Sequence, residues 1–153
     1  MRIFSYHLVE TSPLTSLKVF LFPPKISGLR HAEFFAAMTL GAPIISPARM
    51  QLHRLGVFAY WEDESHLDNF LSNTRLGAML STGWHVRLQF LRRWGSFVEI
   101  GDLPENKEDT DPNKPVVAVT LARLKLPEVF RFIHWGKPVE EQVRDNPGVS
   151  LAL

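Results

Sequence analysis

The sequence contains no cysteine, and this absence excludes several kinds of chemistry. Without thiol groups the 153-residue chain cannot form a disulfide framework, an iron–sulfur cluster, a thiolate metal site or a cysteine nucleophile. The chain is therefore compatible with a reducing compartment. Because the first residues also lack the apolar core of a secretory signal, we expect a cytoplasmic protein.

An excess of charge of either sign is also missing. The 17 Lys and Arg residues are balanced by 16 Asp and Glu residues, which leaves a formal net charge of +1. A general nucleic-acid binder needs an excess of positive charge to neutralise phosphates, and no basic tract supplies one locally. We therefore expect no nucleic-acid partner.

No apolar run is long enough to cross a bilayer. The longest uncharged stretch, residues 34–48, is interrupted by Gly41, Pro43 and Pro47, and it is shorter than the roughly 20 apolar residues that a spanning helix needs. We therefore expect no integral membrane segment. The composition, with 45% hydrophobic and 22% charged residues, is that of a globular chain.

Four common functional motifs are absent as well. The chain has no phosphate-binding Gly-x-x-x-x-Gly-Lys-Ser/Thr loop, no Gly-x-Gly-x-x-Gly turn, no Gly-x-Ser-x-Gly elbow and no His-Glu-x-x-His helix. These absences argue against nucleotide hydrolysis, the usual dinucleotide binding, serine esterase chemistry and zinc peptidase chemistry.

What is present is a hydrophobic periodicity that predicts an α+β fold. Ser12 before Pro13 is typical of a helix start, and Ser65 with Asp68 is typical of a capping box. The expected elements are a strand at 3–10, a helix at 13–22, strands at 28–40 and 52–61, a helix at 65–82 and a strand at 84–100. This βαββαβ order is that of a ferredoxin-like unit, whose helices cover one face of an antiparallel sheet.

The pattern restarts in the last quarter of the chain. Residues 101–114 carry five acidic residues and two lysines, which predicts a solvated linker. A strand at 116–123, a helix beginning at Pro127 that Pro138 restarts or kinks, and a second strand after Gly148 then repeat the opening elements.

This repeat predicts the start of a second, similar unit. We expect a ferredoxin-like α/β-barrel unit at 1–100, an acidic linker at 101–114 and a partial second α/β-barrel unit at 115–153, whose completion would take the chain to roughly 200 residues. The alternative is that the last segments cap the first sheet.

Three residues are candidates for catalysis. His31 and Glu33 lie on the same face of one expected strand, about 7 Å apart, where they can orient one another. His53 lies within an apolar strand, and an imidazole there can act as a base or as a metal or haem ligand. The alternatives are a solvated pair at a strand edge and a structural histidine.

Four further residues are candidates for binding a cofactor. His7 has the same status on the first strand as His53 has on the third. Trp84, Arg87 and Arg92 belong to a run in which arginines and indoles alternate, and such side chains can stack on or pair with an anionic group such as a propionate. The alternative is a sheet with aromatic residues on its core face and arginines in water. The sequence indicates no separate metal site.

Several short segments together resemble the spheroidene monooxygenase-like group of proteins. They are Gly28-Leu29, Leu40-Gly41-Ala42-Pro43, Phe58-Ala59-Tyr60-Trp61-Glu62-Asp63-Glu64-Ser65, Leu67-Asp68-Asn69-Phe70, Trp84-His85-Val86-Arg87-Leu88 and Leu91-Arg92-Arg93-Trp94-Gly95. The resemblance implies tandem units of the dimeric α/β-barrel type. It also implies a haem-dependent monooxygenase that oxidises a carotenoid or another long apolar molecule.

No haem ligand is identified by a motif. The function that the resemblance implies would use a haem that is ligated by a histidine and whose propionates contact Arg87 or Arg92. Two other functions remain open: a small-molecule-binding or sensing barrel without catalysis, and an assembly module that pairs through strand edges, for example as a homodimer.

Overall fold

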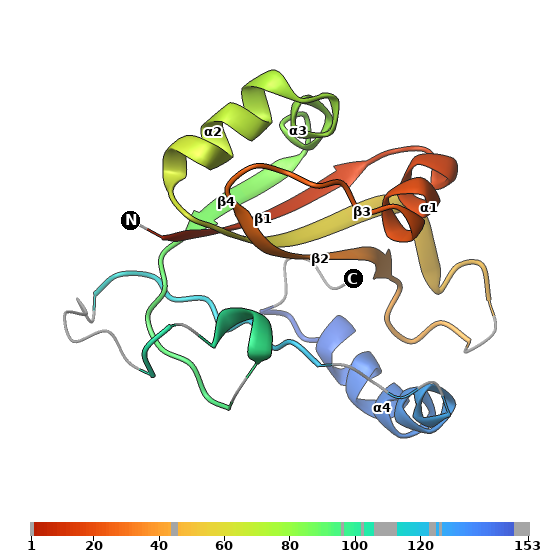
Figure 1. Ribbon diagram of the computed structural model, residues 1–153. Helices are drawn as coiled ribbons and strands as arrows, with labels where there is room; N and C mark the ends of the chain where they lie inside the picture. The colour runs from red at the N-terminus through yellow and green to blue at the C-terminus, as the bar shows by residue number, and fades with distance from the viewer. Residues whose placement is uncertain are drawn as a thin grey trace. The chain divides into compact units, whose positions relative to one another are not determined.

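The computed structural model describes residues 2–43, 46–95, 97–101, 103–105, 113–122, 125 and 127–148 (Figure 1). The chain divides into two compact units. The first consists of residues 1–36 and 52–111, and the second of residues 37–51 and 112–153.

Four strands form one open sheet in the order β2-β3-β1-β4. They are β1 (Ile3–Glu10), β2 (Leu29–Met38), β3 (Met50–Trp61) and β4 (Trp84–Leu88). The central strand β1 pairs antiparallel with both β3 and β4. Together with the helices, this sheet confirms the expected α+β class, and the first three strands lie where the periodicity predicted them.

The first helix follows its sequence signals. Helix α1 (Pro13–Leu21) has Ser12 as its N-cap, whose hydroxyl accepts the Thr15 N–H at 3.2 Å. Proline occupies the first helical position, where its fixed φ favours the helix and its missing N–H costs nothing.

The single helix expected at 65–82 is instead two helices, α2 (Glu64–Asn73) and α3 (Arg75–Leu80). Thr74 has extended backbone, which ends α2, and its hydroxyl caps α3 by accepting the Gly77 N–H at 2.9 Å. The predicted capping box of Ser65 and Asp68 is also wrong. Asp63 caps α2 because its carboxylate accepts the His66 N–H at 3.0 Å.

Strand β4 is much shorter than the strand expected at 84–100. Leu88 lies opposite Phe4, which is close to the beginning of β1. Beyond Leu88 the chain therefore has almost no partner backbone left for strand hydrogen bonds. After β4 the chain turns at Gly95, where φ is +77°, and forms a short 3-10 helix, η1 (Val98–Ile100).

The register assigns opposite faces of the sheet to alternate residues. Ile3, Ser5, His7 and Val9 of β1 lie on the face that α1, α2 and α3 cover (Figure 1). The core there includes Leu55, Val57, Ala59 and Trp61 of β3, Val19 of α1, Leu67 and Phe70 of α2, and Leu80 of α3. The other face carries Phe4, Tyr6 and Leu8, and it lies opposite the side that α1, α2 and α3 cover. We call it the open face.

The second unit contains one long helix, α4 (Glu128–Arg144), which begins just after Pro127 as expected. The helix continues through Pro138 rather than restarting there. The strand expected at 116–123 is wrong for the residues that the structure describes in it: 116–122 form no strand, and Val116 and Val117 are exposed. Alternating β-branched residues do not form a strand without a partner strand or a face to bury.

The strand expected after Gly148, and most of the acidic linker, lie outside the described residues. The domain boundaries expected at 1–100, 101–114 and 115–153 stay a prediction.

Candidate functional site

Three aromatic side chains from three strands meet on the open face. The Tyr6 ring lies 6.0 Å from the Phe35 ring and 5.7 Å from the Trp84 ring, measured between centroids. We call Tyr6, Phe35 and Trp84 the aromatic cluster. Tyr6 and Phe35 are half-buried, whereas Trp84 is 62% exposed. The cluster therefore presents ring surface that a ligand can reach.

Gly56 of β3 makes room for this arrangement. A Cβ atom at position 56 would lie 2.2 Å from the Phe35 ring, which is far inside van der Waals contact. The ring of Phe35 therefore occupies the space that any larger residue would fill. Because Gly56 of β3 has no side chain, the Phe35 ring of β2 can approach the Tyr6 ring of β1.

A second aromatic group on the same face is buried and has a structural role. The Phe4 ring stacks on Tyr60 and Phe58 with centroids 4.7 and 5.4 Å apart. All three side chains are less than 10% exposed. Stacked rings of this kind stabilise a sheet but leave little surface for a ligand.

His31 and Glu33 also lie on the open face, on the same side of β2 as Phe35. The His31 Nε2 atom is 2.8 Å from the Glu33 Oε1 atom, and both side chains are partly exposed. The His31 ring also packs against the Phe97 ring in a T-shaped arrangement, with centroids 6.2 Å apart. A carboxylate that bonds one imidazole nitrogen orients the ring and makes it a better base or ligand.

The His31–Glu33 pair lies near the aromatic cluster along β2. Glu33 and Phe35 are two residues apart on one face, which is about 7 Å along a strand. A molecule resting on the cluster can therefore reach the pair with one end. Burial raises the pKa of Tyr6, so its hydroxyl stays protonated and can donate a hydrogen bond.

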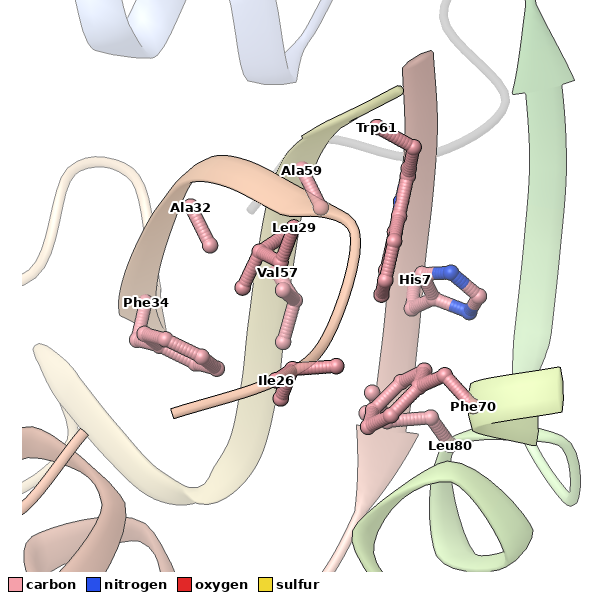
Figure 2. A pocket seen from close by; sticks show the side chains of 10 residues that line it. All are labelled: His7, Ile26, Leu29, Ala32, Phe34, Val57, Ala59, Trp61, Phe70 and Leu80. Atoms are coloured by element: carbon pink, nitrogen blue, oxygen red, sulfur yellow. The ribbon is translucent and has the colours of Figure 1, made fainter. Parts of the chain in front are cut away.

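His7 lies on the opposite face of the sheet, inside the core. Its side chain is 1% exposed and lines a small cavity with apolar and aromatic neighbours from β2, β3, α2 and α3 (Figure 2). The volume of this cavity is about 10 Å³, which is the space of one water-sized sphere. Burial, with His85 and Arg87 nearby, lowers the pKa of His7 to about 4. The ring is therefore neutral at physiological pH.

Arg87 and Arg92 have partners within the chain. Arg87 lies on the helix face of β4, where its two terminal nitrogens bond Glu64 at 2.5 Å and Asp68 at 2.6 Å. The guanidinium of Arg92 lies 4.4 Å from the ring centroid of exposed Trp94, a cation–π contact.

His53 lies near the start of β3 with an exposed side chain, although its neighbours further along the strand are buried. Of the seven predicted site residues, the structure therefore brings together His31, Glu33 and Trp84 on the open face. His7 and Arg87 belong to the other face, and His53 and Arg92 are exposed.

The described residues do not fit the expected haem. The buried histidine, His7, faces a cavity of about 10 Å³, which is far too small for a porphyrin. His53 is exposed, and Arg87 is already paired with two carboxylates. No three His, Asp or Glu side chains in the described part of the chain come together as metal ligands.

Sequence reasoning missed Tyr6 and Phe35 as site residues. Their positions in alternating strands were visible, and Phe35 shares its parity with His31 and Glu33. The contact of Tyr6 with Trp84, however, depends on the pairing of β1 with β4, in which Tyr6 lies opposite Val86 and Leu8 opposite Trp84. No local pattern in the sequence contains that register.

Comparisons with models of known protein families, with curated proteins and with solved structures find no match to this chain. Among the residues that the structure describes, no helix is both long and apolar enough to cross a membrane.

Proposed function

We propose that the first unit is a ferredoxin-like unit of the α/β-barrel type that binds a flat or elongated apolar small molecule on its open face. The observation that carries this proposal is the aromatic cluster, in which Tyr6, Phe35 and Trp84 converge from three strands. Two other features support it. The strand order β2-β3-β1-β4 with antiparallel pairing fits that type of unit, and helices cover the opposite face.

The ligand class follows from the chemistry of the cluster. Ring faces and edges favour a conjugated or aromatic molecule, because stacking adds to the free energy of burying apolar surface. His31, held by Glu33, and the Tyr6 hydroxyl can each hydrogen-bond a polar group at one end. A long apolar molecule with one hydroxyl or carbonyl group meets both requirements.

All-trans-retinol is a suitable probe, since it is a conjugated chain that ends in a hydroxyl. We expect saturable binding to the full chain, measured by the fluorescence of the retinol. Trp84→Ala and Gly56→Ala should each weaken binding about fivefold, because loss of a ring contact costs on the order of 1 kcal/mol. In Gly56→Ala the new methyl group displaces the Phe35 ring.

Trp94→Ala is the matched control. Trp94 is 77% exposed in the same unit and contacts Arg92 rather than the cluster. Its removal should leave the affinity for retinol unchanged. Equal affinities of the Trp84→Ala and Trp94→Ala variants would contradict the proposal.

Monooxygenation of the bound molecule is a second candidate function. It is favoured by the His31–Glu33 pair, since a carboxylate-bonded imidazole beside an apolar site can take a proton from a substrate. Such a reaction would consume dioxygen, two electrons from an external reductant and two protons, and would release water. We expect an oxygenated product from a polyene in wild-type protein with ascorbate and air, and at least a hundredfold slower reaction in His31→Ala.

The addition of haem is a separate experiment. A Soret band after addition of haem to the full chain, lost in one histidine variant, would favour the haem-dependent reaction implied by the resemblance. Product formed equally in His31→Ala would exclude the role given to His31, while retinol binding to the cluster would remain measurable on its own.

The arrangement of chains is also a proposal. Two open faces packed together would enclose a ligand between them, and a homodimer is the simplest way to supply the second face. Light scattering should then give twice the mass of the chain for wild type and a monomer for Trp84→Arg. If wild type is monomeric and still binds retinol, a single chain forms the whole binding site and the proposed homodimer is wrong. A cytoplasmic location is proposed on the sequence composition alone.

A further inference from the structure

The second unit contains a buried ion pair between segments that are far apart in the sequence. Arg49 lies at the end of the connection between β2 and β3, and Glu140 lies in α4. One carboxylate oxygen of Glu140 accepts a hydrogen bond from the Arg49 Nη2 atom. The other accepts the backbone N–H of Gly41 at 2.9 Å.

The two donors are positioned by the β2–β3 connection itself. Gly41 has a φ of +78°, a left-handed conformation that glycine adopts without strain. The Arg49 side chain is 3% exposed, and its Nη1 atom donates to the Ala42 carbonyl at 2.5 Å. Its Nε atom is buried and has no hydrogen-bond partner. The guanidinium is thus fixed within the connection, and a donor remains unused.

A buried guanidinium requires an anion, because an unpaired charge in the interior is costly. A guanidinium edge together with a backbone N–H is also the donor set with which proteins bind free carboxylates. Arg49 and Gly41 therefore form a carboxylate site by their own geometry, whichever carboxylate fills it.

The helix that supplies the present occupant is otherwise weakly held. Helix α4 has no buried residue, and Phe132, Trp135 and Val139 on it are each more than half exposed. Helices in proteins are mostly stabilised by burying an apolar face, and the inward residues of α4 such as Val129 and Ile133 are only half-buried. The Glu140 side chain, 13% exposed, bonds the β2–β3 connection through both carboxylate oxygens.

We propose that Arg49 and the Gly41 amide form a carboxylate-binding site, that Glu140 is its internal occupant, and that the carboxylate of a ligand takes the same place when Glu140 leaves. This site is independent of the aromatic cluster and of the function proposed for it. The ligand class is a small molecule or chain end that carries a carboxylate group.

Acetate tests the site directly in the full chain. The Glu140→Ala variant vacates the site while keeping α4, and the Gly41 amide resonance in a proton–nitrogen NMR spectrum reports on occupancy. During titration with sodium acetate, with chloride adjusting the ionic strength, the resonance should shift to saturation in Glu140→Ala. Wild type should need at least tenfold more acetate, since Glu140 competes from within the chain.

Two further variants make the result specific. Glu128→Ala removes a carboxylate from the same helix, where Glu128 pairs with Arg131 at the surface, and should behave as wild type. Adding Arg49→Met to Glu140→Ala should abolish saturation. Should Glu140→Ala fail to fold, Glu140→Gln removes the competing charge while keeping the side-chain shape, and its shift should saturate at a lower acetate concentration than that of wild type. A linear shift in the Glu140 variant, or equal shifts in the Glu140 and Glu128 variants, overturns the proposal.

Discussion

The imidazole of His7 stacks on that of His85, its direct neighbour across β1 and β4, with ring centroids 5.5 Å apart and planes 20° apart. The two rings differ in environment. His85 is exposed, whereas His7 is buried and neither of its ring nitrogens has a hydrogen-bond partner. A protonated His7 would place a charge in an apolar core, next to a second imidazole and Arg87. The core therefore tolerates His7 only as a neutral ring.

This relationship makes stability depend on pH. The pKa of His7 falls from an ordinary 6.5 to about 4 on folding, so the unfolded chain binds the proton more tightly than the folded chain. The stability that His7 contributes is complete above pH 6.5 and is lost as the pH falls toward 4. Urea unfolding at pH 5.0 should give a free energy about 2 kcal/mol lower than at pH 7.5 from this group.

The variant His7→Leu should remove that dependence. It should be at least as stable as wild type at pH 7.5, because it eliminates two unpartnered polar atoms from the core. His53→Leu is the control, since His53 is exposed and folding removes little water from it. If His7→Leu kept the full pH dependence of wild type, the loss of stability would have to come from another group.

Two buried serines provide a matched test of hydrogen bonding in the core. Ser5 and Ser16 are both fully buried. The Ser5 hydroxyl accepts the indole N–H of buried Trp61 at 2.9 Å, whereas the Ser16 hydroxyl has no partner. Ser5→Ala leaves the indole N–H unpaired and should lower the free energy of unfolding by about 1–3 kcal/mol.

Ser16→Ala should be neutral or stabilising, since it removes an unpaired hydroxyl and places alanine in α1. Both variants can be measured by thermal unfolding followed by circular dichroism. Equal losses of stability in the two variants would show that the hydroxyl of Ser5 contributes nothing beyond its volume.

The pairing of Arg87 predicts only a small effect of its removal. Its partners Glu64 and Asp68 are more than half exposed, and such ion pairs contribute little in water. Arg87→Met should lower stability by less than about 1 kcal/mol, and 0.5 M salt should erase the difference. A larger loss that persists in salt would indicate that Arg87 has a role other than this ion pair.

Parts of this fold were predictable from local sequence. The period-two alternation of 3–10 located β1, and Ser12-Pro13 located the start of α1 within one residue. Such features depend on neighbours in the chain. The end of β4 depends instead on where β1 begins, and no local window contains that dependence. The break at Thr74 does have a local cause, since its hydroxyl accepts the Gly77 N–H, but the apolar periodicity that predicted one helix did not reveal it.

The candidate site was also predictable only in part from the sequence. Strand parity alone placed His31, Glu33 and Phe35 on one face, as the structure has them. Parity did not say which face the helices cover, so His7 and Arg87 were grouped with residues from which the sheet separates them. The contact of Arg49 with Glu140 joins positions 91 residues apart and follows no sequence motif.

Gly77 and Gly136 both lie in helices, and the space around them predicts opposite effects of the same substitution. A Cβ at Gly77 would lie 2.0 Å from the backbone oxygen of Phe70 and 2.8 Å from the Cα of Leu71. Since neither backbone atom can move aside without breaking the junction of α2 and α3, Gly77→Ala should lower the free energy of unfolding by about 1–3 kcal/mol.

At Gly136, nothing lies within 4 Å of the added methyl group. Alanine favours a helix over glycine by about 1 kcal/mol, so Gly136→Ala should slow amide hydrogen exchange in α4 by up to about fivefold without lowering the melting temperature. Thermal unfolding and amide exchange of both variants test this contrast. A destabilised Gly136→Ala chain would mean that α4 packs closely at this position, whereas an unchanged Gly77→Ala chain would mean that α2 and α3 separate at little cost.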